Sequence, residues 1–365
     1  MQKIEILEII PSYTKANGVG NFVNNLASSI NKKKYNITTI AIRSRRDESM
    51  KAHLQKNEVA TEDTTIDDGF FKFMRNLRRI LNEKNISIIH CNVPQAAAYV
   101  FPLAKKYGVK TRINHSHVVK SSEHVIKSML NNMLIFFGDH FATNFFACSQ
   151  LAGEKVFKKK QFIVIENAIN FDEFKFNKSQ RKEVRGRYDI DNKTVLGNVG
   201  RLAKVKNQIF LLDLIEKLNK ESEQYVLIIV GNGPEEASLR REAKKRKISE
   251  SIIIINEAKK ISELYNSFDI FVMPSKYEGL GLTAIEAQVN GLPCILSEKI
   301  PKEASISDSV QYLPIAKKHT WLWIDAIKNL NDDRYEQGSL NQNFNLKNMT
   351  NKVERLFMEM ELKNE

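Results

Sequence analysis

The sequence predicts an α/β fold built from two doubly wound parallel sheets. Short apolar runs rich in β-branched residues recur along the 365 residues and alternate with helix-length amphipathic stretches. The alternation appears twice, and a charged polar stretch at 176–193 separates the two series. Because such alternation is typical of parallel sheets that helices cover on both faces, we expect two domains joined by a linker.

Each half offers six candidate strands. In the first half they are 3–10, 37–42, 86–91, 111–115, 144–149 and 162–167. In the second half they are 194–200, 225–231, 251–256, 270–275, 293–297 and 311–315. Ligands of doubly wound sheets bind beyond the carboxyl ends of the strands, so we expect the functional site in a cleft where the two domains face each other.

The composition is that of a globular protein, with 42% hydrophobic and 27% charged residues. The three cysteines, Cys91, Cys148 and Cys294, lie far apart in or beside apolar runs, so we expect buried free thiols rather than disulfides or a metal cluster. Charged residues interrupt the start of the sequence, which is unlike a signal peptide. No apolar run approaches the ~20 residues of a spanning helix, and a cytoplasmic protein is expected.

The positive charge is concentrated in the first half. The chain has a formal net charge of +13, of which residues 1–180 carry +11 and residues 181–365 carry +2. This asymmetry indicates an anionic partner for the first half, such as a membrane surface or nucleic acid, unless it reflects only a lysine-rich composition. Since no stretch interleaves aromatic and cationic residues as a nucleic-acid-binding module would, no nucleic-acid partner is expected.

Two stretches of the first half could contact an anionic membrane. Residues 70–84 carry apolar residues at helical spacing with cations between them, the pattern of a basic amphipathic helix. Such a helix could lie on lipid, but packing against its own sheet is the commoner use of the pattern and is the one expected here. The same two alternatives apply to 125–146.

Three loops combine glycines or cations with the end of a strand. Gly18 and Gly20 follow the first strand, where bare N–H groups at a helix start can approach an anion, although a tight turn without a ligand has the same pattern. Arg201 and Lys206 can clamp a diphosphate, the arginine as a fork and the lysine as a point charge. Gly231 begins a Gly-Asn-Gly-Pro turn that lets the chain turn sharply.

The stretch 275–293 places two glutamates eight residues apart. A strand ends at its start, a loop holds Glu278, and the helix that follows holds Glu286 and stops at Gly291. N–H groups at the helix start are then free for a phosphate, and the glutamates can accept hydrogen bonds from neutral hydroxyls on either side. A nucleotide sugar has this layout. The N–H groups concerned are those of Leu280, Gly281, Leu282 and Thr283.

Jointly these motifs resemble the GT-B retaining glycosyltransferases of family 4 over essentially the whole chain. Glu278 and Glu286 match the family's E-x7-E motif, and Arg201 with Lys206 looks like its phosphate clamp. The stretch Arg112-Ile-Asn-His115-Ser-His117 is similar to bacterial exopolysaccharide and capsule enzymes of the family. Further matches are Gly18-Val-Gly20, Ala147-Cys-Ser149, Gly231-Asn-Gly-Pro234, Phe268-Asp269 and Gly291-Leu-Pro293.

The resemblance implies transfer of a hexose from a nucleotide sugar, with uridine as the expected base and retention at the anomeric carbon. Glu278 would bind the transferred sugar, and His115 matches a family histidine that contacts this sugar and supports catalysis. His117 could take that place instead. No metal or cofactor is expected, since cations and helix N–H groups can stabilise the departing diphosphate. The other donor-binding residues would be Gly18, Gly20, Arg201, Lys206, Gly231, Leu280, Gly281, Leu282, Thr283 and Glu286.

The implied architecture is GT-B, with two Rossmann-like domains. Domain 1–175 would receive the acceptor, domain 176–344 would bind the donor, and a helix at 345–365 would pack back onto the first domain. The acceptor would be a glycan or a polyprenyl-diphosphate-linked oligosaccharide at the cytoplasmic face of the membrane. The alternatives are a non-catalytic accessory subunit of a transferase complex and a GT-B sugar-nucleotide epimerase.

Some positions depart from the family pattern. Glu166-Asn-Ala168 stands in place of a Pro-Asn-Gly turn, and Asn17 stands where many members carry glycine, which leaves substrate details open. Asp189-Ile-Asp191 spells the D-x-D of metal-dependent transferases. It precedes the first strand of the second half within charged residues, so we expect a turn there.

Overall fold

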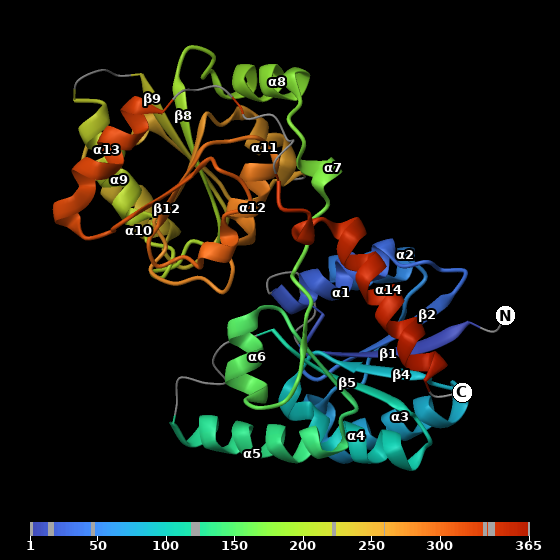
Figure 1. Cartoon of the computed structure of the whole chain (residues 1–365). Coiled ribbons are helices and arrows are strands. Elements are labelled where there is room, and N and C mark those ends of the chain that lie inside the picture. The colour runs from blue at the N-terminus through green and yellow to red at the C-terminus, as the bar shows by residue number, and fades with distance from the viewer. Residues whose placement is uncertain are drawn as a thin grey trace. The chain divides into compact units, whose positions relative to one another are not determined.

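The structure is a computed structural model that describes residues 3–13, 18–44, 48–117, 125–220, 224–258, 260–330, 334 and 340–363. The chain divides into two compact units. The N-unit comprises Met1–Ile169 and Gln342–Glu365, and the C-unit comprises Asn170–Asn341 (Figure 1). The division at Ile169 lies a few residues before the boundary expected from the sequence.

The N-unit is built on a fully parallel seven-stranded sheet with the order β3-β2-β1-β4-β5-β6-β7. All six expected strands of this half are present. The additional strand, β3, is a short edge strand without an apolar run, so the sequence pattern gave no signal for it. The strands are β1 (Ile4–Ile10), β2 (Tyr35–Ala41), β3 (Ala60–Glu62), β4 (Ile88–Cys91), β5 (Thr111–Ser116), β6 (Asn144–Ala147) and β7 (Ile163–Val164).

Helices cover both faces of this sheet and bury one core on each face. On one face α14 lies beside α1 (Figure 1), and Val353 and Phe357 of α14 pack against strand residues such as Ile6. On the other face α3 and α4 bury Phe73 and Phe101 against the sheet. The helices are α1 (Gly18–Ser29), α2 (Glu48–Lys56), α3 (Phe70–Glu83), α4 (Ala97–Lys106), α5 (Val125–Phe141), α6 (Gln150–Phe157) and α14 (Leu346–Leu362).

The C-unit repeats the plan with a six-stranded parallel sheet of order β10-β9-β8-β11-β12-β13. All six expected strands are again present, as β8 (Thr194–Val199), β9 (Tyr225–Val230), β10 (Ile252–Ile255), β11 (Ile270–Met273), β12 (Cys294–Ser297) and β13 (Val310–Leu313). The helices are α7 (Phe171–Phe174), α8 (Lys178–Tyr188), α9 (Ile209–Leu218), α10 (Glu236–Lys245), α11 (Ile261–Ser267), α12 (Leu282–Val289) and α13 (Thr320–Asn329).

The charged stretch 176–193 is not the free linker that its composition suggested. It forms α8, and Arg185 of this helix donates to Asp269 and to the backbone carbonyl of Ser267. Arg181 also pairs with Asp269. The cations that indicated a solvated linker therefore fasten the helix to the C-unit. Asp189 ends α8 in the left-handed conformation, which confirms that the D-x-D triplet is a turn.

None of the described helices is both long enough and apolar enough to cross a membrane. The described residues also contain no group of three or more His, Cys, Asp or Glu side chains arranged to hold a metal ion. The three cysteines are free, as expected, with Cys91 and Cys294 buried and Cys148 partly buried.

Candidate active site

The strand order of the C-unit reverses between β8 and β11, the place where open parallel sheets bind ligands. Backbone hydrogen bonds join the loops that follow β8, β9 and β11. Leu202 donates to the carbonyl of Asn232 over 2.8 Å, and Lys276 donates to the carbonyl of Val205 over 2.8 Å. The three loops therefore form one cradle at the carboxyl ends of adjacent strands. Residues 200–208, 231–235 and 274–281 make up this cradle.

Two glycines of the turn after β9 are required by close packing. A Cβ on Gly231 would lie 2.1 Å from the carbonyl oxygen of Gly200, and one on Gly233 would lie 2.3 Å from that of Leu202. Both glycines also have positive φ, which disfavours other residues. The turn thus holds the β8 loop in place, and contact of Gly231 with a donor stays a prediction.

Lys206 and Glu278 form an ion pair within the cradle. Lys206 Nζ lies 2.6 Å from Oε1 and 2.8 Å from Oε2 of Glu278, and both side chains are largely buried. From the sequence, Lys206 was expected to bind the diphosphate of the donor and Glu278 its sugar. In the structure the two side chains contact each other. Arg201 is exposed, and its guanidinium has no protein partner among the described residues.

The helix of the E-x7-E motif begins and ends where the sequence indicated. Gly281 precedes α12 in the left-handed conformation, with φ of 93°, and Leu282 is the first helical residue. The first N–H groups of a helix have no partner within it, so those of Leu282 and Thr283 are oriented as a phosphate site requires. Gly291 ends the helix with φ of 82°. Glu278 lies in the loop and Glu286 in the second turn.

Glu286 has a buried partner that sequence reasoning missed. Tyr265 of α11 is completely buried, and its hydroxyl donates to Glu286 Oε2 over 2.6 Å. Burial raises the pKa of Glu286 to about 7, and the hydrogen bond from Tyr265 offsets part of this rise. No sequence motif marks Tyr265, because one tyrosine in an amphipathic helix looks like any other core residue.

The N-unit holds His115 and His117 at the carboxyl end of β5. His115 was expected to face a cleft, but its side chain is completely buried. His90 Nε2 lies 2.9 Å from His115 Nδ1, and His90 Nδ1 lies 2.9 Å from Glu8 Oε1. Glu8 and His90 are register partners in β1 and β4, the two strands at which the N-unit order reverses.

A second branch of the same network reaches His117. Asn92 Nδ2 donates to Glu8 Oε2 over 2.7 Å, and His117 Nε2 lies 2.9 Å from Asn92 Oδ1. The rings of His115 and His117 are 3.9 Å apart, and Phe22 of α1 packs against both. Burial lowers the pKa of His115 well below its ordinary value and that of His117 to about 3, so both are neutral.

Sequence reasoning missed Glu8, His90 and Asn92, although a signal existed. Glu8 and His90 stand inside apolar runs that were expected to form strands buried on both faces. A charged or titratable residue in such a strand needs a polar partner, so the two could have been paired.

The Gly18–Gly20 loop agrees with expectation in that α1 begins at Gly18. Asn17 lies outside the described residues.

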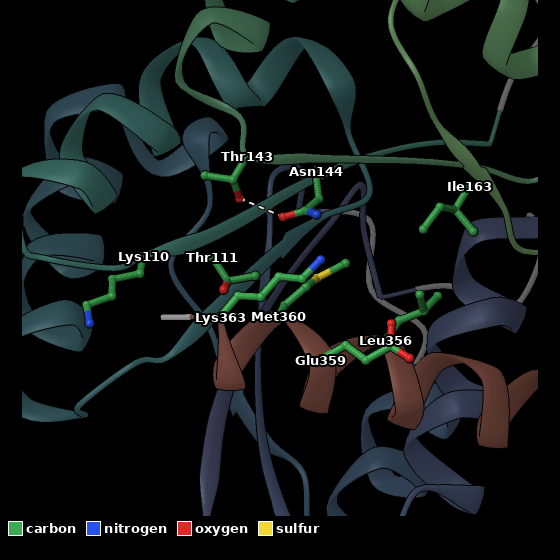
Figure 2. A pocket seen from close by; sticks show the side chains of 9 residues that line it. All are labelled: Lys110, Thr111, Thr143, Asn144, Ile163, Leu356, Glu359, Met360 and Lys363. Carbon is green, nitrogen blue, oxygen red and sulfur yellow. Dashed lines mark hydrogen bonds between the residues drawn. The ribbon is translucent and has the colours of Figure 1, made fainter. Parts of the chain in front are cut away.

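Two cavities among the described residues lie away from the histidines. A cavity of about 230 Å³ opens at the amino ends of β5, β6 and β7 (Figure 2). Thr111, Asn144 and Ile163, the first residues of these strands, line it together with the end of α14. His115 lies near the other end of β5. A smaller cavity of about 170 Å³ adjoins the C-unit cradle and is lined by Asn207 and Lys276.

Several known proteins are similar to this chain in sequence or in fold. Residues 180–343 match the family profile described as glycosyl transferases group 1. A putative glycosyltransferase of Bacillus subtilis, EpsF, is 29% identical over 243 residues, which are 63% of this chain and 62% of EpsF. The chain thus matches less than two thirds of that relative. CapH of Staphylococcus aureus, a capsular polysaccharide biosynthesis glycosyltransferase, is 27% identical over 71% of this chain and 73% of its own length.

Two further proteins extend the likeness over most of the chain. An Escherichia coli UDP-Gal:α-D-GlcNAc-diphosphoundecaprenol α-1,3-galactosyltransferase is 22% identical over 79% of each chain. The crystal structure of Anabaena HepE in complex with UDP superposes with a TM-score of 0.79 at 16% identity, covering 98% of this chain and 100% of HepE. The chain is therefore similar in sequence to group 1 glycosyltransferases over residues 180–343, and its two Rossmann-like sheets have the GT-B fold.

Proposed function

We propose that the enzyme transfers a sugar, with retention, from a UDP-sugar to a glycan or lipid-linked oligosaccharide during synthesis of a cell-surface polysaccharide. The Lys206–Glu278 ion pair in the cradle is the observation that carries this proposal. Lys206 can bind a diphosphate and Glu278 can accept a hydrogen bond from a hydroxyl. The two side chains lie together in the loops after β8 and β11, where the strand order reverses. The UDP complex of HepE and the capsular role in the name of CapH support the donor and the pathway class.

In the proposed reaction the donor diphosphate replaces Glu278 as the partner of Lys206. Arg201, which has no protein partner among the described residues, adds a bidentate contact, and the N–H groups of Leu282 and Thr283 add a third. Glu278, once released, accepts a hydrogen bond from the sugar. As the bond to the anomeric carbon breaks, these fixed donors stabilise the growing negative charge on the leaving diphosphate. We propose that no metal ion is required.

The remaining roles follow the same chemistry. Glu286 accepts hydrogen bonds from the ribose, and Tyr265 holds its carboxylate in position. His115 contacts the transferred sugar and supports catalysis, and His117 is a further sugar or acceptor contact. Gly18 and Gly20 let the start of α1 approach the donor.

We further propose that the N-unit receives the acceptor at a membrane surface, and α5 is the contact that the structure favours. The outward side of α5 carries Met129, Leu130, Met133, Phe136 and Phe137, all exposed, with 81% of Phe136 accessible to solvent. No charged residue lies between Met129 and Phe137. An exposed apolar strip of this kind is typical of helices that lie in a lipid interface.

The inward side of α5 explains why its apolar residues face outward. Asn131 and Asp139 are buried, and Asp139 accepts a hydrogen bond from Asn114 over 2.7 Å. Gly138 packs directly on α4, where a Cβ would lie 2.7 Å from that of Ala97. The fold thus uses polar and small residues to seat the helix, and Figure 1 shows α5 against α4. The core packing expected for 70–84 holds for α3. Helix α5 packs on α4 and also leaves its apolar strip exposed.

Cations flank the carboxyl end of α5. Lys105 Nζ lies 5.8 Å from the ring centre of Phe141, and Lys160 Nζ lies 4.5 Å from that of Phe145. Lysines beside an apolar strip are the arrangement that binds anionic lipid. An acceptor carried on diphosphoundecaprenol, as the name of the Escherichia coli relative states for that protein, would then be within the enzyme's reach.

The experiment that tests the proposed function is incubation of the purified protein with labelled UDP-sugars and a membrane lipid extract. Transfer of label to lipid or glycan supports the proposal. Interconversion of the free sugar nucleotide would instead indicate an epimerase. Neither product across a panel of UDP-sugars would indicate an accessory subunit.

A further inference from the structure

Glu8 lies at the fork of a buried hydrogen-bonded network whose branches end at His115 and His117. We infer that Glu8, through His90 and Asn92, is a positioning residue that fixes the tautomers of both histidines. Each histidine then presents one nitrogen lone pair, and the two together accept hydrogen bonds from hydroxyls of a bound sugar. The tautomers follow from the hydrogen-bond geometry with one proton on each ring, whereas the sugar as ligand rests on the proposed function.

The first branch determines the proton on His115. A carboxylate only accepts hydrogen bonds, so His90 donates its Nδ1–H to Glu8 Oε1 over 2.9 Å. With a single proton on the His90 ring, its other nitrogen carries a lone pair, which accepts Nδ1–H of His115 over 2.9 Å. His115 therefore keeps its proton on Nδ1, and its Nε2 is an acceptor.

The second branch determines the proton on His117 by the same rule. The amide of Asn92 donates Nδ2–H to Glu8 Oε2, so its Oδ1 is the atom turned towards His117. Because an amide oxygen only accepts, His117 donates Nε2–H to it. Nδ1 of His117 is then left as an acceptor.

The two acceptor nitrogens have no partner in the protein. His115 Nε2 and His117 Nδ1 are both buried, and neither makes a hydrogen bond within the described residues. Asn167 Oδ1 is a third buried acceptor without a protein partner among the described residues, and its side chain interacts with His117. Buried polar atoms without protein partners are rare, and a bound ligand or water can supply the missing partner.

The polarity of these atoms selects the ligand. Lone pairs repel a phosphate, so the diphosphate is not the group recognised here. A neutral polyhydroxyl compound brings O–H donors, and two adjacent acceptors suit neighbouring hydroxyls of one sugar ring. Because both histidines are neutral, the pair lacks the positive charge that would be needed to hold an anion.

The decisive test is long-range ¹⁵N–¹H NMR of the histidine rings in the ligand-free enzyme. We expect His115 to be protonated at Nδ1 and His117 at Nε2 in the wild type. In Glu8→Gln the new amide N–H₂ donates into one of the two branches and reverses it. If it donates to His90 Nδ1, the His115 proton moves to Nε2. If it donates to Asn92, the Asn92 amide turns over and the His117 proton moves to Nδ1. Asp139→Asn, which removes another buried carboxylate of the N-unit, should leave both tautomers as they are.

Wild-type His115 protonated at Nε2, or unchanged tautomers of both histidines in a folded Glu8→Gln protein, would overturn the inference. The wild-type spectrum alone suffices if the variant fails to fold. In transfer assays Glu8→Gln should lower kcat about 10- to 100-fold, the loss that follows removal of the hydrogen-bond partner of a metal-binding histidine. The affinity for UDP should stay unchanged. Glu8→Asp should recover part of kcat. Correct tautomers without any transfer would refute the proposed function but not the tautomer assignment.

Discussion

Lys206 Nζ lies 2.6 Å from Oε1 of Glu278, so the cation proposed for the diphosphate is already neutralised by the carboxylate proposed for the sugar. An incoming diphosphate must displace this carboxylate. The two residues should therefore respond in opposite ways when donor binding is measured.

Lys206→Ala should weaken UDP binding by about tenfold or more, the value of one charged hydrogen bond. Glu278→Gln should leave UDP affinity unchanged or raise it, because a competitor of the phosphate is removed. Both variants should lower transfer by roughly 100-fold or more, since each removes a contact to the reacting group. Isothermal titration and initial rates measure the two effects.

Lys204→Ala is the matched control, because Lys204 is an exposed lysine of the same loop. Its UDP affinity and transfer rate should equal those of the wild type. Equal losses in Lys204→Ala and Lys206→Ala would mean that the loop acts only through its overall charge.

Donor binding should strengthen as pH rises through about 7. The pKa of Glu286 is raised to about 7 by burial, and only its ionised form offers two acceptor oxygens to the ribose. Tyr265→Phe removes the hydrogen bond that lowers this pKa, so the binding midpoint should move to higher pH. UDP affinity measured from pH 5.5 to 8.5 in both proteins checks this, and a midpoint shifted downward would contradict it.

The same group makes stability depend on pH in a defined direction. The pKa of Glu286 is higher in the folded protein than its ordinary value of 4.5, so the folded state holds the proton more tightly. Its contribution to stability is therefore present below pH 4.5 and is lost as pH rises through 7. Between pH 4.5 and 7 the free energy of unfolding, measured with urea, should fall less in Glu286→Gln than in the wild type.

Gly231→Ala should destabilise the C-unit by roughly 2 kcal/mol or more, because its Cβ would meet the carbonyl oxygen of Gly200 in a backbone conformation that disfavours alanine. Gly186→Ala is the control, since that glycine lies in α8 with open space around it and alanine favours a helix. Thermal unfolding compares the two. Equal stability of both variants would show that the β9 turn does not hold the β8 loop.

The enzyme should bind vesicles of phosphatidylglycerol and lose that binding in Met133→Glu/Phe136→Glu. Both side chains are exposed, so the free energy of unfolding should change little. Leu362→Glu, an exposed apolar position on α14, is the control and should bind like the wild type. Co-sedimentation at low salt measures the effect. Undiminished binding of the α5 variant would exclude α5 as the contact.

Transfer should continue after treatment with EDTA, because the proposed charge stabilisation comes from Arg201, Lys206 and helix N–H groups. Rates measured with and without added magnesium or manganese should agree within about twofold. A rate that falls to background with EDTA and returns with a metal would contradict this part of the proposal.

Features of the fold that repeat along the sequence could be predicted, and features that occur once were harder to predict. Strand–helix alternation repeats many times, so all twelve expected strands were found, while the three-residue edge strand β3 was not. The E-x7-E helix was placed correctly because Gly281 and Gly291 bound it. Composition misled at 176–193, since buried arginines fasten α8 to Asp269.

Partners between distant segments were beyond the sequence. Lys206 and Glu278 were each singled out, but their mutual ion pair depends on β8 and β11 being neighbours across the strand-order reversal. Tyr265 acts only through Glu286, and Glu8 reaches His115 only through His90. Such positioning residues lack a local motif, because their role lies in a contact rather than in a spacing.

The central claim is that the cradle around Lys206 and Glu278 binds a UDP-sugar for transfer. Its most direct test is sugar transfer from a labelled UDP-sugar to membrane lipid extract by the wild type, Lys206→Ala and Lys204→Ala in parallel. We expect labelled product with the wild type and Lys204→Ala, and a loss of about 100-fold or more with folded Lys206→Ala. Product formed at the wild-type rate by Lys206→Ala would contradict it.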